Sequence, residues 1–142
     1  MDDILSRFEP CYSSGRYKDI IGWKKAYSYI DNEDTPFRFR AIEVIVKLII
    51  PKDAGVVFTY SKCRASYARV EGIYKCIEGH YLEPSEDEAL DIKTAVSGFD
   101  HSFSYTTGHI VRPDCFDSNY RVECSYGINF FRTYKEAVKY IP

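Results

Sequence analysis

Residues 41–51, "AIEVIVKLIIP", carry the strongest strand pattern in the chain. Apolar residues occupy every second position from Ile42 to Ile50, and the positions between them mix apolar residues with Glu43 and Lys47. A period of two is the side-chain period of a β-strand. Pro51 cannot donate a ladder hydrogen bond and is expected to end the strand. The stretch therefore predicts a long strand with one face in the core.

Further strands are expected on the C-terminal side of this one. Turn-forming residues fill positions 51–55, and Gly72 is expected to mark a bulge or bend. The predicted strands are 56–60, 65–77, 103–112 and 128–132. The first 40 residues are expected to be irregular, with short helical pieces at most.

Two capping boxes predict helices, because a Ser or Thr followed three residues later by Glu satisfies the first free N–H groups of a helix. Ser85 and Glu88 predict a helix over 86–96, within a helical insertion at 83–98 that ends at Gly98. Thr133 and Glu136 predict a final helix that runs through residue 140.

These elements predict an α+β fold class. We expect a β-rich single domain over residues 20–142, with a mixed or antiparallel sheet or a partly open barrel and short peripheral helices. Residues 1–19 are expected to form an irregular N-terminal arm.

Charge and composition argue against several classes of partner. The chain has 142 residues and a net charge of −2, so it carries no large positive surface for nucleic acid or anionic lipid. The short basic segments at 23–25 and 38–40 are expected to be solvated edges rather than phosphate sites. The acidic start and the lack of a long apolar run predict neither a leader peptide nor a membrane span.

The cysteines are expected to be free thiols in a reducing cytosol or nucleus, because their number is odd and they form no tight framework. They are Cys11, Cys63, Cys76, Cys115 and Cys124. No close pair suits zinc, so neither a metal nor a cofactor is predicted. Lys62 and Arg64 would favour a thiolate at Cys63 if that residue were exposed. A small buried cysteine is the favoured interpretation there, and Cys124 is expected to be a core and turn residue.

Five blocks occur in order along the chain: "GWKKA" at 22–26, "VIVKLIIPKDAG" at 44–55, "KCRASYARV" at 62–70, "GHIVRPDCFD" at 108–117 and "VECSYGINFFRTYKEAVKY" at 122–140. This series resembles an uncharacterised domain of large DNA viruses, iridoviruses and mimivirus relatives among them, and of some phages. In some relatives it follows pentapeptide repeats. The resemblance covers residues 20–141 and implies a viral origin and a compact β-rich fold, but no known reaction. The chain departs from it at Asn129, where histidine is expected, and in the acidic insertion at 83–98.

The "KCRAS" and "ECSYGINFF" blocks are interpreted as a structural motif. The first is expected to enter a strand with charges outward and small residues inward. The second is expected to make a tight turn and then fill the core beneath the last helix. The residues of this motif are Cys63, Arg64, Cys124, Gly127, Phe130 and Phe131.

The leading functional hypothesis is a non-catalytic structural or interaction protein of a large DNA virus, such as a minor capsid component that binds other viral proteins. It would be located in the virion and, during infection, in the host cytoplasm. The arm would dock through aromatic anchors, which are Phe8, Tyr12, Tyr17 and Trp23. The alternative for these aromatics is that they cover the domain's own core.

Two other functions remain open. One is a viral binding module directed at a host factor. The other is a small cysteine-dependent enzyme that acts on a nucleotide, which predicts a concave pocket near Cys63 or Cys124 with a perturbed thiol.

Overall fold

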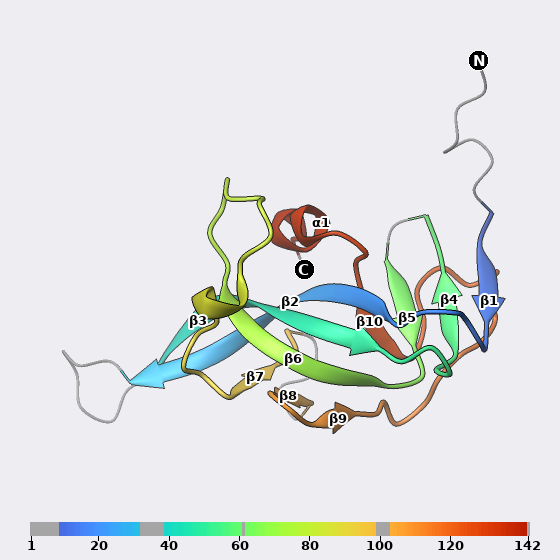
Figure 1. Cartoon of the computed structure of the whole chain (residues 1–142), viewed down its shortest axis with the longest axis horizontal. Helices are drawn as coiled ribbons and strands as arrows, with labels where there is room; N and C mark the ends of the chain where they lie inside the picture. The colour runs from blue at the N-terminus through green and yellow to red at the C-terminus, as the bar shows by residue number, and fades with distance from the viewer. Residues whose placement is uncertain (1–8, 32–38, 61, 99–102, 142) are drawn as a thin grey trace, which may run out of the picture.

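Two antiparallel sheets form the body of the molecule (Figure 1). The computed structural model describes residues 9–31, 39–60, 62–98 and 103–141. The larger sheet has the strand order β8-β7-β2-β3-β6-β9, and the smaller one has the order β1-β4-β5-β10. The elements are β1 (Cys11–Ser13), β2 (Ile20–Asp31), β3 (Phe39–Ile50), β4 (Val56–Phe58), β5 (Cys63–Ala65), β6 (Ala68–Lys75), β7 (Thr94–Val96), β8 (Ser104–Thr106), β9 (Ile110–Val111), β10 (Ile128–Phe130) and α1 (Tyr134–Lys139).

Strands β2 and β3 form a long hairpin at the centre of the larger sheet. They pair in register from Ile20 opposite Ile50 to Asp31 opposite Phe39. The strand predicted at residues 41–51 is confirmed, but the prediction that the first 40 residues are irregular is wrong for β2 and for β1. Small residues hide the pattern of β2, because Gly22 lies where a Cβ atom would come within 2.7 Å of the Phe130 ring.

Strand β6 pairs with β3, and this pair contains the expected bulge. Lys47 lies opposite Gly72 and Leu48 lies opposite Val70, so Glu71 is the additional residue. Of the single strand predicted at 65–77, Ala65 belongs to β5, which lies between β4 and β10 in the smaller sheet, and residues 68–75 form β6 of the larger sheet. Each of the two segments therefore contributes to a different sheet.

The helix predicted at 86–96 is wrong. Residues Glu86–Glu88 form one 3-10 turn, and Ser85 makes no side-chain cap to the backbone. Strand β7 follows instead and pairs with β8. The N–H group of Leu90 donates to the Ile73 carbonyl oxygen at 2.8 Å, and Ala95 is buried. Attachment to the sheet and burial of Ala95 therefore override a local helix signal.

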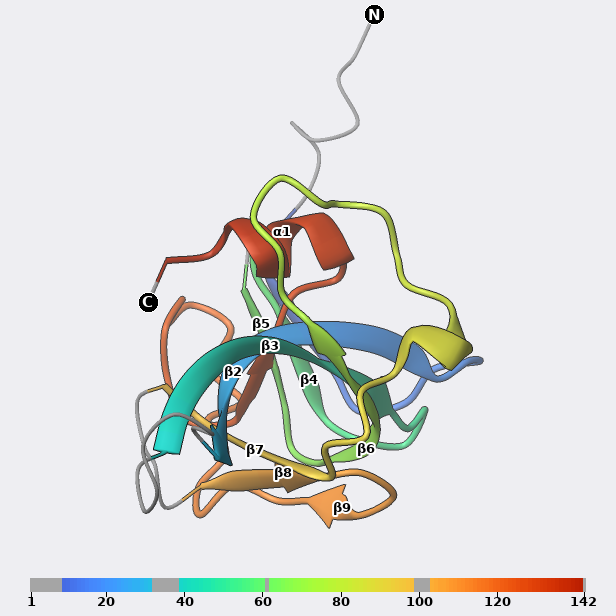
Figure 2. The same ribbon diagram turned by 90° about the vertical axis from the view of Figure 1, so that its left-hand side faces the viewer.

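The predicted final helix is confirmed as α1, which is shorter than expected. The Glu136 N–H donates to Thr133 Oγ1 at 3.2 Å, as a capping box requires. Helix α1 lies on one face of the central strands β2, β3 and β6. The strands β7 and β8, at one end of the same sheet, fold back beneath the other face (Figure 2).

Both faces of the central strands are therefore buried. On the α1 side, Trp23, Ile45 and Phe131 pack with residues of the helix. On the other side, Val44, Val46, Leu48 and Tyr105 belong to the larger core cluster. The two layers explain why residues 44–46 and 48 are all buried, although only alternate positions share one face.

The predicted fold class is correct in its β-rich, antiparallel character. Neither sheet closes into a barrel, and the α+β class with peripheral helices is matched only in part. In the part of the chain that the structure describes, the helical content is α1 and one 3-10 turn. No helix found there has the length and apolar character needed to cross a membrane.

Candidate ligand-binding cavity

A cavity of about 660 Å³ lies along the edge of β2. At one end of this edge, Trp23 exchanges two backbone hydrogen bonds of 2.8 and 2.7 Å with Phe131. At the other end, Tyr27 pairs with Val96 of β7. Lys24 and Lys25 lie between these two points and line the cavity. This Lys24 cavity thus opens where β2 passes from one neighbouring strand to the other.

Lys24 is a basic group of this cavity whose side chain packs against an aromatic ring. Its Nζ atom lies 5.2 Å from the centroid of the Tyr105 ring. Burial lowers the pKa of Lys24 to about 8, and the positive charge of Lys62 contributes in the same direction. No carboxylate in the described ranges forms a salt bridge with this ammonium group. The Lys24 amine is therefore partly unprotonated near neutral pH.

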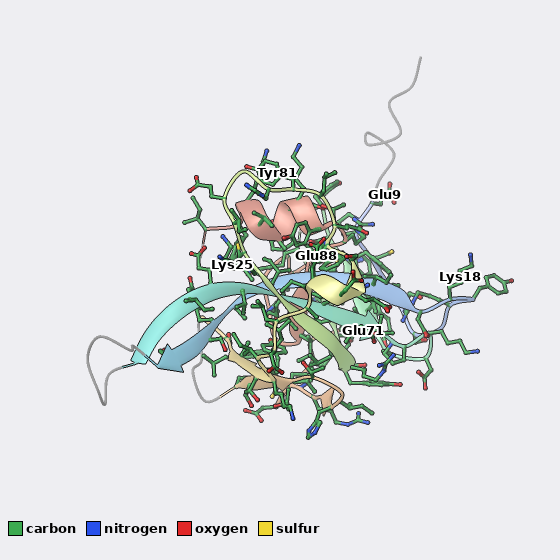
Figure 3. All side chains as sticks on the ribbon, turned by 60° about the vertical axis from the view of Figure 1, so that its left-hand side comes forward. Glu9, Lys18, Lys25, Glu71, Tyr81 and Glu88 are labelled. Carbon is green, nitrogen blue, oxygen red and sulfur yellow. The ribbon has the colours of Figure 1, made fainter. Side chains whose placement is uncertain are left out.

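Lys25 and Lys62 have partners on the C-terminal segment. Lys25 Nζ donates to the Tyr140 carbonyl oxygen at 2.6 Å and lies 3.8 Å from Glu43 Oε2. Lys62 Nζ lies 3.4 Å from the Tyr140 hydroxyl and 5.0 Å from the centroid of the ring. Figure 3 labels Lys25 on β2, below α1. The end of the chain therefore holds two of the three lysines at the cavity.

Aromatic rings form much of the remaining wall. They are Tyr27, Phe103, Tyr105, Tyr126, Phe131 and Tyr140. Burial raises the pKa of Tyr105, so its phenol stays protonated over the physiological range. The wall thus offers planar apolar surface beside positive charge.

A buried arginine fixes the loop that closes the cavity on another side. Arg64 lies on β5 and is 1% exposed. Its guanidinium donates to four backbone carbonyl oxygens of one loop: Asp117 at 2.7 Å, Asn119 at 2.7 Å, Val122 at 2.8 Å and Glu123 at 3.3 Å. The prediction that the charges of the "KCRAS" block point outward is therefore wrong for Arg64, because the loop carbonyls supply the polar contacts that its charge needs.

Asp117 and Gly127 complete this loop. Asp117 Oδ2 accepts from Ser125 Oγ at 2.6 Å, and Oδ1 accepts from the Asn119 N–H at 2.9 Å. These two hydrogen bonds, with a smaller contribution from Arg64, lower the pKa of Asp117. Gly127 has a φ of +152°, and a Cβ atom there would lie 3.0 Å from Arg64 Cβ. The turn thus needs glycine for both its conformation and its closeness to β5.

The cysteines divide into buried and exposed groups. Cys63 is fully buried, and burial raises the pKa of its thiol, so the flanking cations do not produce a thiolate. Cys124 is exposed and lines the cavity together with Cys115, which corrects the expectation of a core residue. The turn that Arg64 holds presents Cys124 outward. A concave pocket near Cys124 is therefore present. Burial raises the thiol pKa of the half-buried Cys76 as well as that of Cys63.

Of the predicted partner anchors that the structure describes, Tyr12 and Tyr17 are exposed and Trp23 is buried. Phe8 lies outside the described residues. Trp23 is 1% exposed and packs edge-on against Tyr134 at 5.2 Å, so it offers no exposed ring to a partner. Tyr12 is 43% exposed and lies 6.2 Å from Phe116 between ring centroids. Tyr17 is fully exposed.

Phe130 and Phe131 are both buried, in different layers. Phe130 belongs to the larger core and Phe131 packs beneath α1. Only Phe131 therefore fits the expected position beneath the last helix.

Sequence reasoning missed Lys24 and Lys25, which were expected at a solvated edge. Had β2 been recognised, the alternation of Gly22, Lys24 and Ala26 would have placed Lys24 on a face with small residues. Asn129, the position where the chain departs from the resemblance, lines the same cavity. Among residues 9–31, 39–60, 62–98 and 103–141, no group of three or more His, Cys, Asp or Glu side chains is arranged to hold a metal ion.

Comparison with known proteins gives a family but no activity. A search of curated proteins and a search of solved structures each found no match. A protein-family model matches residues 9–137, which contain both sheets and all but the last residues of α1. The chain therefore belongs to the family that this model describes, the "Family of unknown function (DUF5758)".

Proposed function

We propose that this chain is a non-catalytic binding domain whose ligand is a small anion with a planar aromatic body, held in the Lys24 cavity. A mononucleotide is one member of that class. The observation that carries the proposal is the combination of Lys24 and Lys62 with an aromatic wall in one cavity.

Size and charge support this ligand class. A volume of about 660 Å³ falls within the range of small-molecule sites. Three lysines and one aspartate, Asp114, are the charged residues that the structure places around the cavity. This excess of positive charge favours an anion, and the aromatic rings favour a flat ligand through stacking.

Equilibrium titration tests the proposal with pyridoxine 5′-phosphate and adenosine monophosphate as trial ligands. We expect binding that weakens with added salt, because both partners are charged. Lys62→Gln should weaken binding about tenfold, the effect of losing about 1.4 kcal/mol of charge interaction. Lys135→Gln is the matched control, because Lys135 lies over the Tyr81 ring, away from the residues of this cavity.

Two results would count against the proposal. The first is that neither ligand binds at millimolar concentration. The second is that Lys135→Gln weakens binding as much as Lys62→Gln does, since binding would then follow total charge rather than the cavity.

A second candidate function is the structural role in a large DNA virus, with the chain as a minor capsid component. The exposure of Tyr17 on the N-terminal segment favours it, because aromatic side chains are common anchors at protein interfaces. A viral origin is proposed on the resemblance of the sequence blocks. The host-directed binding module would use the same surface in another location.

Proteomics of purified, protease-treated virus particles separates these locations. A high and fixed copy number inside the particle would support the structural role, and Tyr17→Ser should then lower incorporation. Absence from particles together with abundance in infected cells would contradict it and favour a host-directed role.

A further inference from the structure

We propose that Lys24 is a nucleophilic amine that captures the carbonyl group of an anionic aromatic aldehyde as an imine. This inference rests on the proposed function, because it assigns the covalent chemistry of the same cavity. It goes further in naming the reacting atom, Lys24 Nζ, and the functional group that the ligand must carry.

The surroundings of Lys24 suit a nucleophile. The side chain is half-buried, and its Nζ atom lies over the Tyr105 ring at 5.2 Å. The cavity gives a ligand access to this atom. In the described part of the chain, no carboxylate forms a salt bridge that would hold the amine in its charged form. Lys24 differs in this respect from Lys25, which lies beside Glu43.

An anionic aldehyde also needs a positive charge near the amine, on a different side chain, and Lys62 supplies it. Its charge is close enough to lower the pKa of Lys24, so one anionic ligand can be near both lysines. Binding of the anionic group near Lys62 would leave the carbonyl carbon free to approach Lys24.

The pKa of about 8 supports the same assignment. At pH 7, a lysine with this pKa has roughly 300 times more unprotonated amine than a lysine with the usual value near 10.5. The unprotonated form carries the lone pair that attacks a carbonyl carbon.

The step balances without another reactant. The lone pair of the Nζ atom forms a bond to the aldehyde carbon, and the carbonyl oxygen takes a proton to give a carbinolamine. Loss of water then forms the C=N bond of the imine. Borohydride delivers hydride to the imine carbon and water supplies a proton to nitrogen, which converts the reversible adduct into a stable secondary amine.

Pyridoxal 5′-phosphate provides the trial aldehyde, because it combines an aromatic ring, a phosphate and an aldehyde group. The full chain is incubated with it at limiting concentration at pH 7, reduced with borohydride and mapped by peptide mass spectrometry. We expect at least about tenfold more label on Lys24 than on Lys47 or Lys135. Excess pyridoxine 5′-phosphate, which has no aldehyde, should suppress this label by competition.

Two variants make the test specific. Lys24→Arg keeps a positive charge but removes the nucleophile and should abolish the preferred label. Lys47→Arg should leave it unchanged, because Lys47 lies 5.4 Å from the Trp23 ring and does not line the cavity. Circular dichroism on both variants checks that each is folded.

The outcomes separate this inference from the proposed function. Binding of pyridoxine 5′-phosphate with even labelling of all lysines would overturn the imine and leave the binding proposal standing. Absence of binding together with even labelling would overturn both. Preferred labelling of Lys24 that the competitor suppresses would support both.

Discussion

Arg64 Nη2 donates a 2.7 Å hydrogen bond to the carbonyl oxygen of Asn119, 55 residues later in the chain. It is one of four such bonds from the same guanidinium. Through them a core residue of β5 determines the position of an exposed loop. That loop carries Cys124, Ser125 and Tyr126 to the wall of the Lys24 cavity. The shape of the cavity therefore depends on a residue that does not line it.

Arg64→Lys should destabilise the fold by about 3–5 kcal/mol. Lysine keeps the charge but cannot reach four carbonyl oxygens, so buried polar groups lose their partners. Urea unfolding at pH 7 measures the change. Arg69→Lys is the matched control, because Arg69 is exposed and pairs with Glu71 at 2.9 Å; it should change stability by less than about 0.5 kcal/mol. Equal effects from the two substitutions would contradict the assigned role of Arg64.

Gly127→Ala should cost about 2–4 kcal/mol, more than the same change at Gly79. Both glycines have positive φ, +152° and +87°, so both substitutions carry backbone strain. A Cβ atom at Gly127 would also press against Arg64 Cβ at 3.0 Å, whereas nothing lies within 4 Å at Gly79. Denaturant midpoints of the two variants compare the total cost of the two substitutions. A Gly79→Ala variant that is equally unstable would show that conformation alone accounts for the loss.

The sequence predicts a strand best where the alternation of side chains is long and uninterrupted. β3 is recognisable because its alternation is long and ends at Pro51. β2 is not, because the small residues Gly22, Ala26 and Ser28 interrupt its apolar pattern. Gly22 lies against Phe130, and Ser28 Oγ donates to the Thr94 carbonyl oxygen, so both contacts come from distant segments. The prediction of a helix after Ser85 is wrong for a related reason. The local capping signal favours a helix, but residues 94–96 instead form β7 and pair with β8. At Thr133 no strand pairing competes with the capping box, and the predicted helix α1 forms.

The site was harder to predict than the fold. Lys24, Cys115 and Tyr105 are far apart in sequence and meet only because β2, β8 and the loop before Asp117 converge. A basic pair on an unrecognised strand looks like a solvated edge. The inward direction of Arg64 is also invisible locally, because the carbonyl oxygens that receive its hydrogen bonds lie 53 to 59 residues away.

Lys24→Met should change how stability depends on pH. The pKa of Lys24 falls from 10.5 to about 8 on folding, so the unfolded chain binds more protons between these values. The stability contributed by the wild-type residue is therefore lower below pH 8 and rises as the pH increases towards 10.5. Because the ammonium also faces the cavity, we expect a rise of about 1–2 kcal/mol rather than the full value of the shift.

Urea unfolding of wild type and Lys24→Met from pH 6 to pH 10 measures this difference. Subtracting the two curves removes the contributions of tyrosines with raised pKa values, which both proteins share. The difference should be flat below pH 7. A flat difference across the entire range would mean that Lys24 has an ordinary pKa.

Thr133→Ala should destabilise the protein by about 1 kcal/mol, because Thr133 Oγ1 accepts from the Glu136 N–H at the start of α1. Ser85→Ala is a matched control with the same sequence motif, and it should cost less than about 0.5 kcal/mol because Ser85 makes no side-chain cap to the backbone. Thermal unfolding of both variants gives the comparison. Since α1 covers Trp23 and Phe131, loss of the cap should also increase the fluorescence quenching of Trp23 by acrylamide. Equal losses in the two variants would show that the motif, rather than the hydrogen bond that Thr133 makes, determines the effect.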